Sequence, residues 1–117
     1  MNFGDLTVDE FLARYPSYAA IPRYTLDALY RYIRYGIAPG DSLASALAGN
    51  FVEAVCRADY ANRPVLHLLV MLIENHTPHG CHRLGNRCDQ DVCDQWREQV
   101  LARAQAAELA TEKRSGQ

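Results

Sequence analysis

The segment Val65–Glu74 constrains the fold of this chain most strongly, because apolar residues cover most of its helical circumference. Seven of its ten residues are Val, Leu or Ile, and His67, Met71 and Glu74 share the remaining strip. A helix that is apolar nearly all round is stable only when other elements cover it. We therefore predict that this segment is the central helix of the domain, with Leu69 in the core.

The segment Pro22–Tyr35 shows the clearest amphipathic pattern. Its apolar residues follow the spacing i, i+3, i+4, i+7, as Leu26, Leu29, Tyr30 and Ile33. Gly36 follows where a left-handed residue would end the helix. Upstream, Thr7 and Glu10 have the spacing of a capping box and predict a short helix that ends before Pro16.

Three further segments complete the predicted architecture. Two short helices are expected at Ser42–Ala48 and Asn50–Ala58, and a last helix at Asp91–Glu112. The last helix carries one apolar stripe, formed by Val92, Trp96, Val100, Ala104 and Ala107, so we expect Trp96 in the core. The pattern predicts an all-α fold: an irregular bundle of about six helices in a single domain, 1–110, followed by a polar, frayed tail, 111–117.

Composition narrows the class of protein. Hydrophobic residues make up 49% of the chain, which is enough for one core in 117 residues. The net charge is −2, which argues against a histone-like binder of bulk polyanions. No apolar run approaches the ~20 residues that span a bilayer, and the acidic N-terminal segment lacks the pattern of a secretory signal. We therefore predict a cytoplasmic protein that does not associate with membranes.

Residues 24–81 resemble a family of small uncharacterised helical proteins encoded by phages, prophages and plasmids. The matching stretches are YRYIRYGIAPGDSLASALAGNFVEAVCRAD at 30–59, NRPVLHLLVMLIEN at 62–75 and PHGC at 78–81. The chain departs from the family pattern at Ser42, where an aromatic residue is usual, and at Gly49-Asn50, where Asn-Asp is usual. The resemblance implies a compact helical fold, an origin in a mobile element and a bacterial host, and it implies no catalytic residues.

Three cysteines and three histidines occur within the 18 positions from His76 to Cys93. Zinc favours four thiolate or imidazole ligands, commonly delivered by a loop and the helix that follows it. The gaps between the cysteines are six and four residues, which is not the spacing of a standard zinc finger. The predicted ligands of a structural zinc ion are His79, Cys81, Cys88 and Cys93.

Other roles for these cysteines remain open. They could be unliganded thiols, with Cys93 as a small core residue on the apolar stripe of the last helix. A disulfide is disfavoured in a reducing compartment. A nucleophilic Cys93 near a helix N-terminus would need a substrate site, and no such site is evident from the sequence. We therefore predict no enzymatic activity.

The outer face of the helix at Pro22–Tyr35 is the predicted partner-binding surface. It carries the residues Tyr24, Arg31, Arg34 and Tyr35, beside Asp27 and Ala28. Tyr and Arg are enriched at protein interfaces, and they also stack on nucleic-acid bases and bind phosphates. The alternative is a solvated face on which Asp27 and Arg31 form an i,i+4 ion pair.

Two functions follow from these observations. The first is a non-enzymatic interaction protein of a phage or mobile element that binds a host protein and inhibits a defence complex, in the manner of an anti-CRISPR protein. This function is an analogy from the implied origin rather than a deduction from residue chemistry. The second is a zinc-bearing regulator that binds nucleic acid through the Arg- and Tyr-bearing helix, and its binding would fall steeply with salt.

Overall fold

The computed structural model describes residues 3–77 and 89–115, and these residues are all-α. In chain order the elements are α1 (Val8–Arg14), the 3-10 helix η1 (Pro16–Ala20), α2 (Arg23–Tyr35), α3 (Asp41–Leu47), α4 (Phe51–Arg57), the 3-10 helix η2 (Arg63–Val65), α5 (Leu66–His76) and α6 (Asp89–Ser115). An isolated bridge between Phe3 and Leu6 is the only β-type pairing in the described ranges. The predicted fold class and the number of helices are confirmed.

Local sequence signals determine where α1 and α2 begin and end. The backbone N–H of Glu10 donates to Thr7 Oγ1 at 3.2 Å, so the predicted cap of α1 is present. Gly36 ends α2 with φ 73°, in the left-handed region that favours glycine. A Cβ atom at Gly36 would lie 3.1 Å from Arg97 Cα, so this glycine also allows α2 and α6 to approach closely.

Two boundaries differ from the prediction. Pro16 follows the end of α1, as predicted, but it also begins η1. Proline fits the first turn of a helix because its missing N–H is not needed there. The last helix begins at Asp89 and ends at Ser115, whereas the predicted helix spans Asp91–Glu112. From Asp89 to Ser115 the sequence contains no Gly or Pro and many Ala, Glu, Gln and Arg residues, which are strong helix formers.

The core is one cluster of buried side chains to which all six α-helices and the N-terminal Phe3 contribute. Leu69, on α5, is 2% exposed, and Leu66, Leu72 and Ile73 are buried beside it, while the predicted strip of His67, Met71 and Glu74 is exposed. On α2, Leu26, Leu29 and Ile33 are buried as predicted. Tyr32, which the predicted stripe omits, is fully buried, whereas Tyr30 is only partly buried.

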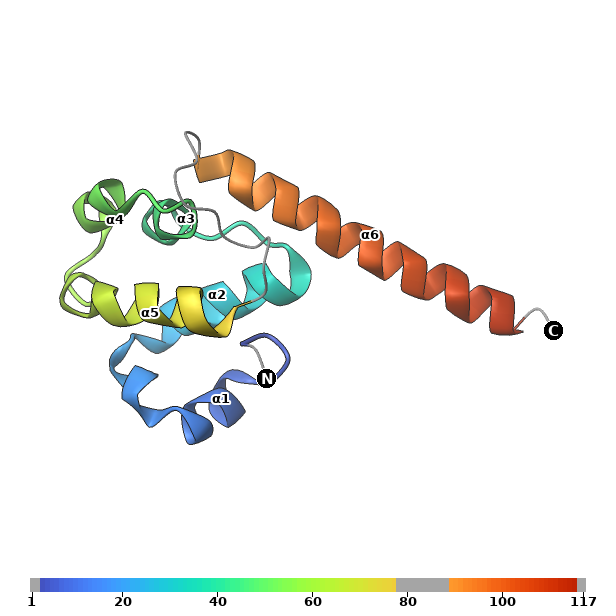
Figure 1. The fold of residues 1–117 in the computed structure, drawn as a ribbon, viewed down its shortest axis with the longest axis horizontal. Helices are drawn as coiled ribbons and strands as arrows, with labels where there is room; N and C mark the ends of the chain where they lie inside the picture. Colours follow the sequence, from blue (N-terminus) through green and yellow to red (C-terminus); the bar gives the residue numbers. More distant parts are fainter. Residues whose placement is uncertain (1–2, 78–88, 116–117) are drawn as a thin grey trace.

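Among the described side chains of α6, residues 93–108, only those near the beginning of the helix belong to this core. Trp96 is 1% exposed, and its Nε1–H lies 2.9 Å from Tyr32 O and 3.2 Å from Ile33 O. Residues 101–108 are all exposed, so the predicted stripe packs at Trp96 and partly at Val100 but not at Ala104 and Ala107. Figure 1 shows α6 extending well past the other helices, along the 55 Å long axis of the molecule. Within residues 3–77 and 89–115, no helix is long and apolar enough to cross a bilayer.

Candidate functional site

The four predicted partner residues on the outer face of α2 are exposed, whereas Asp27 and Ala28 beside them are partly buried. Tyr24 is 54% exposed and Tyr35 is 57% exposed, and Arg31 and Arg34 are also exposed. Buried residues of the same helix project to the opposite side, which is why these four side chains are in solvent. Their orientation agrees with the sequence pattern, and their role in binding remains a prediction.

The ion pair expected between Asp27 and Arg31 is not formed. Asp27 Oδ1 instead accepts from Arg23 Nε at 3.0 Å, and Arg23 Nη1 also contacts Asp9 Oδ1 at 2.6 Å. Both partners of Arg23 are carboxylates, and they raise its pKa, the bond to Asp9 more than the bond to Asp27. Among the residues that the structure describes, Arg31 has no ion-pair partner.

The C-terminal end of α2 forms one wall of a groove, which we call the α2–α6 groove. Its volume is about 480 Å³, and α6 forms the facing wall. The residues that line it are Gly4, Asp5, Ile33, Arg34, Tyr35, Trp96, Val100, Arg103, Ala104 and Ala107. The groove therefore contains two of the predicted partner residues, Arg34 and Tyr35, together with the apolar side of α6 that the core leaves uncovered.

The α2–α6 groove combines an apolar floor with cationic edges. Ile33 and Trp96 are buried at its base, and Arg103 lies with its guanidinium carbon 5.3 Å from the centre of the Trp96 ring. This distance is suitable for a cation–π interaction, which fixes the arginine beside the floor. Arg34 lines the same groove, and no ion pair of Arg34 or Arg103 occurs in the described part of the chain.

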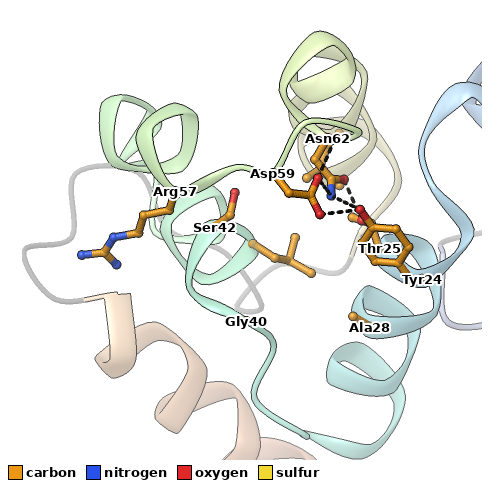
Figure 2. Close-up of a pocket in the computed structure, with 10 residues that line it drawn as sticks. Tyr24, Thr25, Ala28, Gly40, Ser42, Arg57, Asp59 and Asn62 are labelled. Carbon is orange, nitrogen blue, oxygen red and sulfur yellow. Dashed lines mark hydrogen bonds between the residues drawn. The ribbon is translucent and has the colours of Figure 1, made fainter.

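A second hollow lies at the N-terminal end of α2, and we call it the Tyr24 hollow (Figure 2). Its volume is about 520 Å³. The lining comes from α2, the α2–α3 connection, α3, α4, the α4–α5 connection and α5, and consists of Tyr24, Thr25, Ala28, Gly40, Ser42, Leu43, Arg57, Asp59, Asn62 and Leu69. Leu43 and Leu69 are buried and give the hollow an apolar floor.

Hydrogen bonds join α2 to the α4–α5 connection at one side of the Tyr24 hollow. The Tyr24 hydroxyl donates to Asp59 Oδ2, and Asn62 Nδ2 donates to Tyr24 Oη at 3.1 Å. Asn62 also binds Asp59 Oδ1 through its backbone N–H at 2.8 Å and through Nδ2 at 2.9 Å. Thr25 Oγ1 donates to Asn62 Oδ1 at 2.6 Å. These bonds fix the position of the Asp59 carboxylate and of the Tyr24 ring.

The same bonds determine the charges in the Tyr24 hollow. The hydrogen bond from Tyr24 lowers the pKa of Asp59, and the bonds from Asn62 act in the same direction. Conversely, the bond to Asp59 raises the pKa of Tyr24. Hydrogen bonds to a charged carboxylate favour its ionised form, so Asp59 is an anion and Tyr24 is a neutral phenol at neutral pH.

The structure thus divides the four predicted partner residues between two places. Tyr24 belongs to the Tyr24 hollow, Arg34 and Tyr35 belong to the α2–α6 groove, and Arg31 lines neither. Sequence reasoning missed Asp59 and Arg103 as site residues, because each is brought to α2 by a contact between distant parts of the chain. The only local signal was the apolar stripe of the last helix, which indicated a surface in need of a partner.

Three of the four predicted zinc ligands, His79, Cys81 and Cys88, lie outside the described residues. The fourth, Cys93, is 2% exposed and packs in the core cluster with Trp96. This burial agrees with the alternative in which Cys93 is a small core residue. In residues 3–77 and 89–115, no group of three or more potential ligands is close enough to hold a metal ion. The zinc site remains a prediction, and elemental analysis of untagged protein tests it.

Comparisons of the chain with protein-family models, with curated proteins and with solved structures found no match. The resemblance of residues 24–81 to proteins of mobile elements is therefore still a prediction from the sequence. Its function is therefore inferred from the residues that line the groove and the hollow.

Proposed function

We propose that this protein is a non-enzymatic interaction protein that binds a segment of a partner protein in the α2–α6 groove. The proposed segment carries apolar side chains for the floor and carboxylates for Arg34 and Arg103. The observation that carries this proposal is the uncovered apolar side of α6, where Ala104 and Ala107 line the groove but are exposed to solvent.

Residue types in the groove support a protein partner. Tyr and Arg are enriched among the residues that dominate the binding energy of protein interfaces, and the exposed lining of the groove contains Tyr35, Arg34 and Arg103. Tyr35 is held edge-on to Tyr30, with ring centres 6.4 Å apart, so little side-chain freedom is lost when a partner binds.

Charge favours an acidic partner segment. The whole chain has a net charge of −2, but the described charged residues that line the groove are two arginines and one aspartate, Asp5. The local charge is therefore opposite in sign to the charge of the whole molecule. Such complementarity contributes to specificity and to the rate of association.

The class of partner follows from the resemblance of residues 24–81 to proteins of phages and plasmids. A mobile element benefits from proteins that bind and block host machinery, so a host defence complex, such as a CRISPR effector, is the first partner to test. This step is an analogy of origin, whereas the chemistry of the partner segment follows from the groove.

Comparative affinity capture tests the proposal. The wild-type protein, the groove variant Arg34→Glu/Tyr35→Ala and the control variant Arg14→Glu/Tyr60→Ala serve as baits in lysate of a bacterial host. The control makes the same two chemical changes at exposed positions that do not line the groove, including Tyr60, which is 94% exposed. We expect one protein to bind the wild type and the control variant and to be lost from the groove variant.

The captured protein is then purified and titrated directly. The groove variant should bind it at least ~10-fold more weakly than the wild type, a difference of about 1.4 kcal/mol. Equal affinity of the wild type and the groove variant would contradict the proposal. Binding of plain duplex DNA with a steep loss of affinity at high salt would instead favour the nucleic-acid function.

A further inference from the structure

The Tyr24 hollow is a second site that is separate from the α2–α6 groove. Tyr24 and Tyr35 are eleven residues apart on α2, which corresponds to ~16 Å along the helix axis. No residue lines both the hollow and the groove. An inference about the hollow therefore does not depend on the proposed function of the groove.

The Asp59 carboxylate is held in a fixed position and has no counter-charge among the residues that the structure describes. Its described hydrogen-bond donors are the Tyr24 hydroxyl, the backbone and side-chain amide groups of Asn62 and the backbone N–H of Ala61, and all of these are neutral. No ion pair to Asp59 is found in the described ranges, and the residue is exposed. A carboxylate held in this way attracts a cation without first losing side-chain freedom.

Arg57, the one cationic residue among the described residues of the lining, does not neutralise Asp59. Arg57 Nε pairs with Glu53 Oε2 at 3.2 Å, and Nη1 donates to Ser45 Oγ at 3.4 Å. In Figure 2 its guanidinium group points away from Tyr24 and Asp59. Arg57 therefore presents only its apolar methylene stem to the hollow. Long charged side chains often pack in this way, with the stem on an apolar surface and the charged end in water.

The remaining lining suits an aliphatic chain that ends in a cation. The Tyr24 ring is held beside Asp59 by the bond of its hydroxyl group, and an aromatic face within ~6 Å of a cationic nitrogen attracts it. Leu43, Leu69 and Ala28 provide apolar contacts next to this polar end. The volume of about 520 Å³ is in the range of small-ligand sites, which is roughly 300–1,000 Å³.

We propose that the Tyr24 hollow binds an ammonium or guanidinium group carried on an aliphatic chain, with the cation at Asp59 and Tyr24 and the chain on Leu43 and Leu69. Two sources have this chemistry: a lysine or arginine side chain of a partner protein, and a free alkylamine. In both, the cation is paired with a carboxylate beside an aromatic ring, and the aliphatic chain is removed from water.

An NMR titration of the ¹⁵N-labelled full chain tests this proposal. The probes are N-acetyl-lysine methylamide, N-acetyl-arginine methylamide, free n-pentylamine and the neutral isostere N-acetyl-norleucine methylamide. We expect saturable shifts of the backbone amides of Thr25, Gly40 and Asn62 with the cationic probes and at least tenfold weaker shifts with norleucine. Equal shifts with norleucine, or no saturable shift with any cationic probe, would overturn the proposal.

The order of affinity among the cationic probes identifies the source. Tighter binding of the amino-acid amides than of pentylamine supports a side chain of a partner protein. Equal or tighter binding of pentylamine supports a free amine.

Three variants locate the binding. Asp59→Asn removes the charge and should lower the affinity at least tenfold, whereas the matched change Glu108→Gln, on the exposed part of α6, should leave it unchanged.

Because Asp59→Asn also alters the contact between α2 and the α4–α5 connection, Gly40→Leu provides a second test. Gly40 lines the hollow, and a Cβ atom there meets nothing within 4 Å, so a leucine side chain has room at this edge of the hollow without displacing a neighbour. Unchanged affinity in Gly40→Leu would contradict binding in the hollow.

Discussion

The two halves of α6 differ in what surrounds them, although they form one continuous helix. In the first half, Cys93 and Trp96 are buried, and the Trp96 indole nitrogen is bonded to the end of α2. In the second half, every side chain of residues 101–108 is exposed. The comparison teaches that an apolar stripe indicates a face that needs covering but does not identify the surface that covers it.

The two halves should also differ in what stabilises them. The first half is held by burial and by hydrogen bonds to α2, whereas the second half depends on the intrinsic helix preference of its alanines and charged residues. A helix without tertiary contacts is only marginally stable in water. We therefore expect local unfolding of the second half at a much lower free energy than global unfolding.

The largest expected effect is at Trp96. Trp96→Ala removes a fully buried ring and the donor to Tyr32 O and Ile33 O, and it should lower the free energy of unfolding by about 3–5 kcal/mol. Urea denaturation followed by circular dichroism measures this change. Leu101→Ala, in the exposed half, is the control and should cost less than about 0.5 kcal/mol. Similar losses in both variants would remove the distinction between the two halves.

Leu69→Ala tests whether α5 belongs to the same cooperative unit as the beginning of α6. Leu69 is buried but borders the Tyr24 hollow, so the site can relax and the loss should be at the lower end of about 2–5 kcal/mol. We call the packed part of the molecule, up to Val100, the body. It should unfold in a single transition with heat and with urea, and the midpoint should be the same by Trp96 fluorescence and by the helical circular dichroism signal. A loss of less than about 1 kcal/mol would mean that α5 is not central.

A smaller effect is expected from Ala106→Gly in the exposed half of α6. Glycine costs about 1 kcal/mol of helix stability relative to alanine, but here the cost should fall on local unfolding alone. Hydrogen exchange should show faster exchange for residues 101–108 and unchanged exchange for α2 and α5. Slower global folding or a lower midpoint of urea denaturation would show that the second half of α6 is coupled to the body.

The smallest expected effect is a dependence on pH that is confined to the body. The His76 ring lies 4.4 Å from the ring centre of Tyr15 and 5.4 Å from those of Phe11 and Tyr18, and burial lowers its pKa from 6.5. The unfolded chain then binds a proton more readily than the folded chain, so stability is full above about pH 6.5 and falls as the pH drops toward the lowered pKa.

His76→Phe isolates this contribution, because it keeps an aromatic ring and removes the titrating group. Between about pH 7.5 and 5, the midpoint of urea denaturation should fall less in His76→Phe than in the wild type. Hydrogen exchange of residues 101–108, corrected for its intrinsic pH dependence, should be the same in both proteins. Equal pH dependence of the midpoint in both proteins would show that His76 does not carry the effect.

Features that depend on neighbouring residues could be predicted from the sequence. The Thr7 cap, the Gly36 end of α2 and the orientation of the α2 faces all follow from spacing along one helix. The contact between Tyr24 and Asp59 could not be predicted, because it joins residues 35 positions apart whose meeting depends on how α2, α4 and α5 pack. The position at which α6 leaves the core was also beyond prediction, because Val100 and Ala104 belong to the same stripe and only the extent of the facing surface distinguishes them.

The close approach of Gly36 to Arg97 makes α6 a lever whose pivot lies at the end of α2. Arg97 and Glu108 are eleven residues apart, ~16 Å along the helix, so a tilt of ~10° at the pivot displaces the Glu108 end by about 3 Å. The same tilt scarcely moves Trp96, which lies beside the pivot. A larger residue at position 36, which does not line the groove, would press on Arg97 and so change the width of the groove at Ala107.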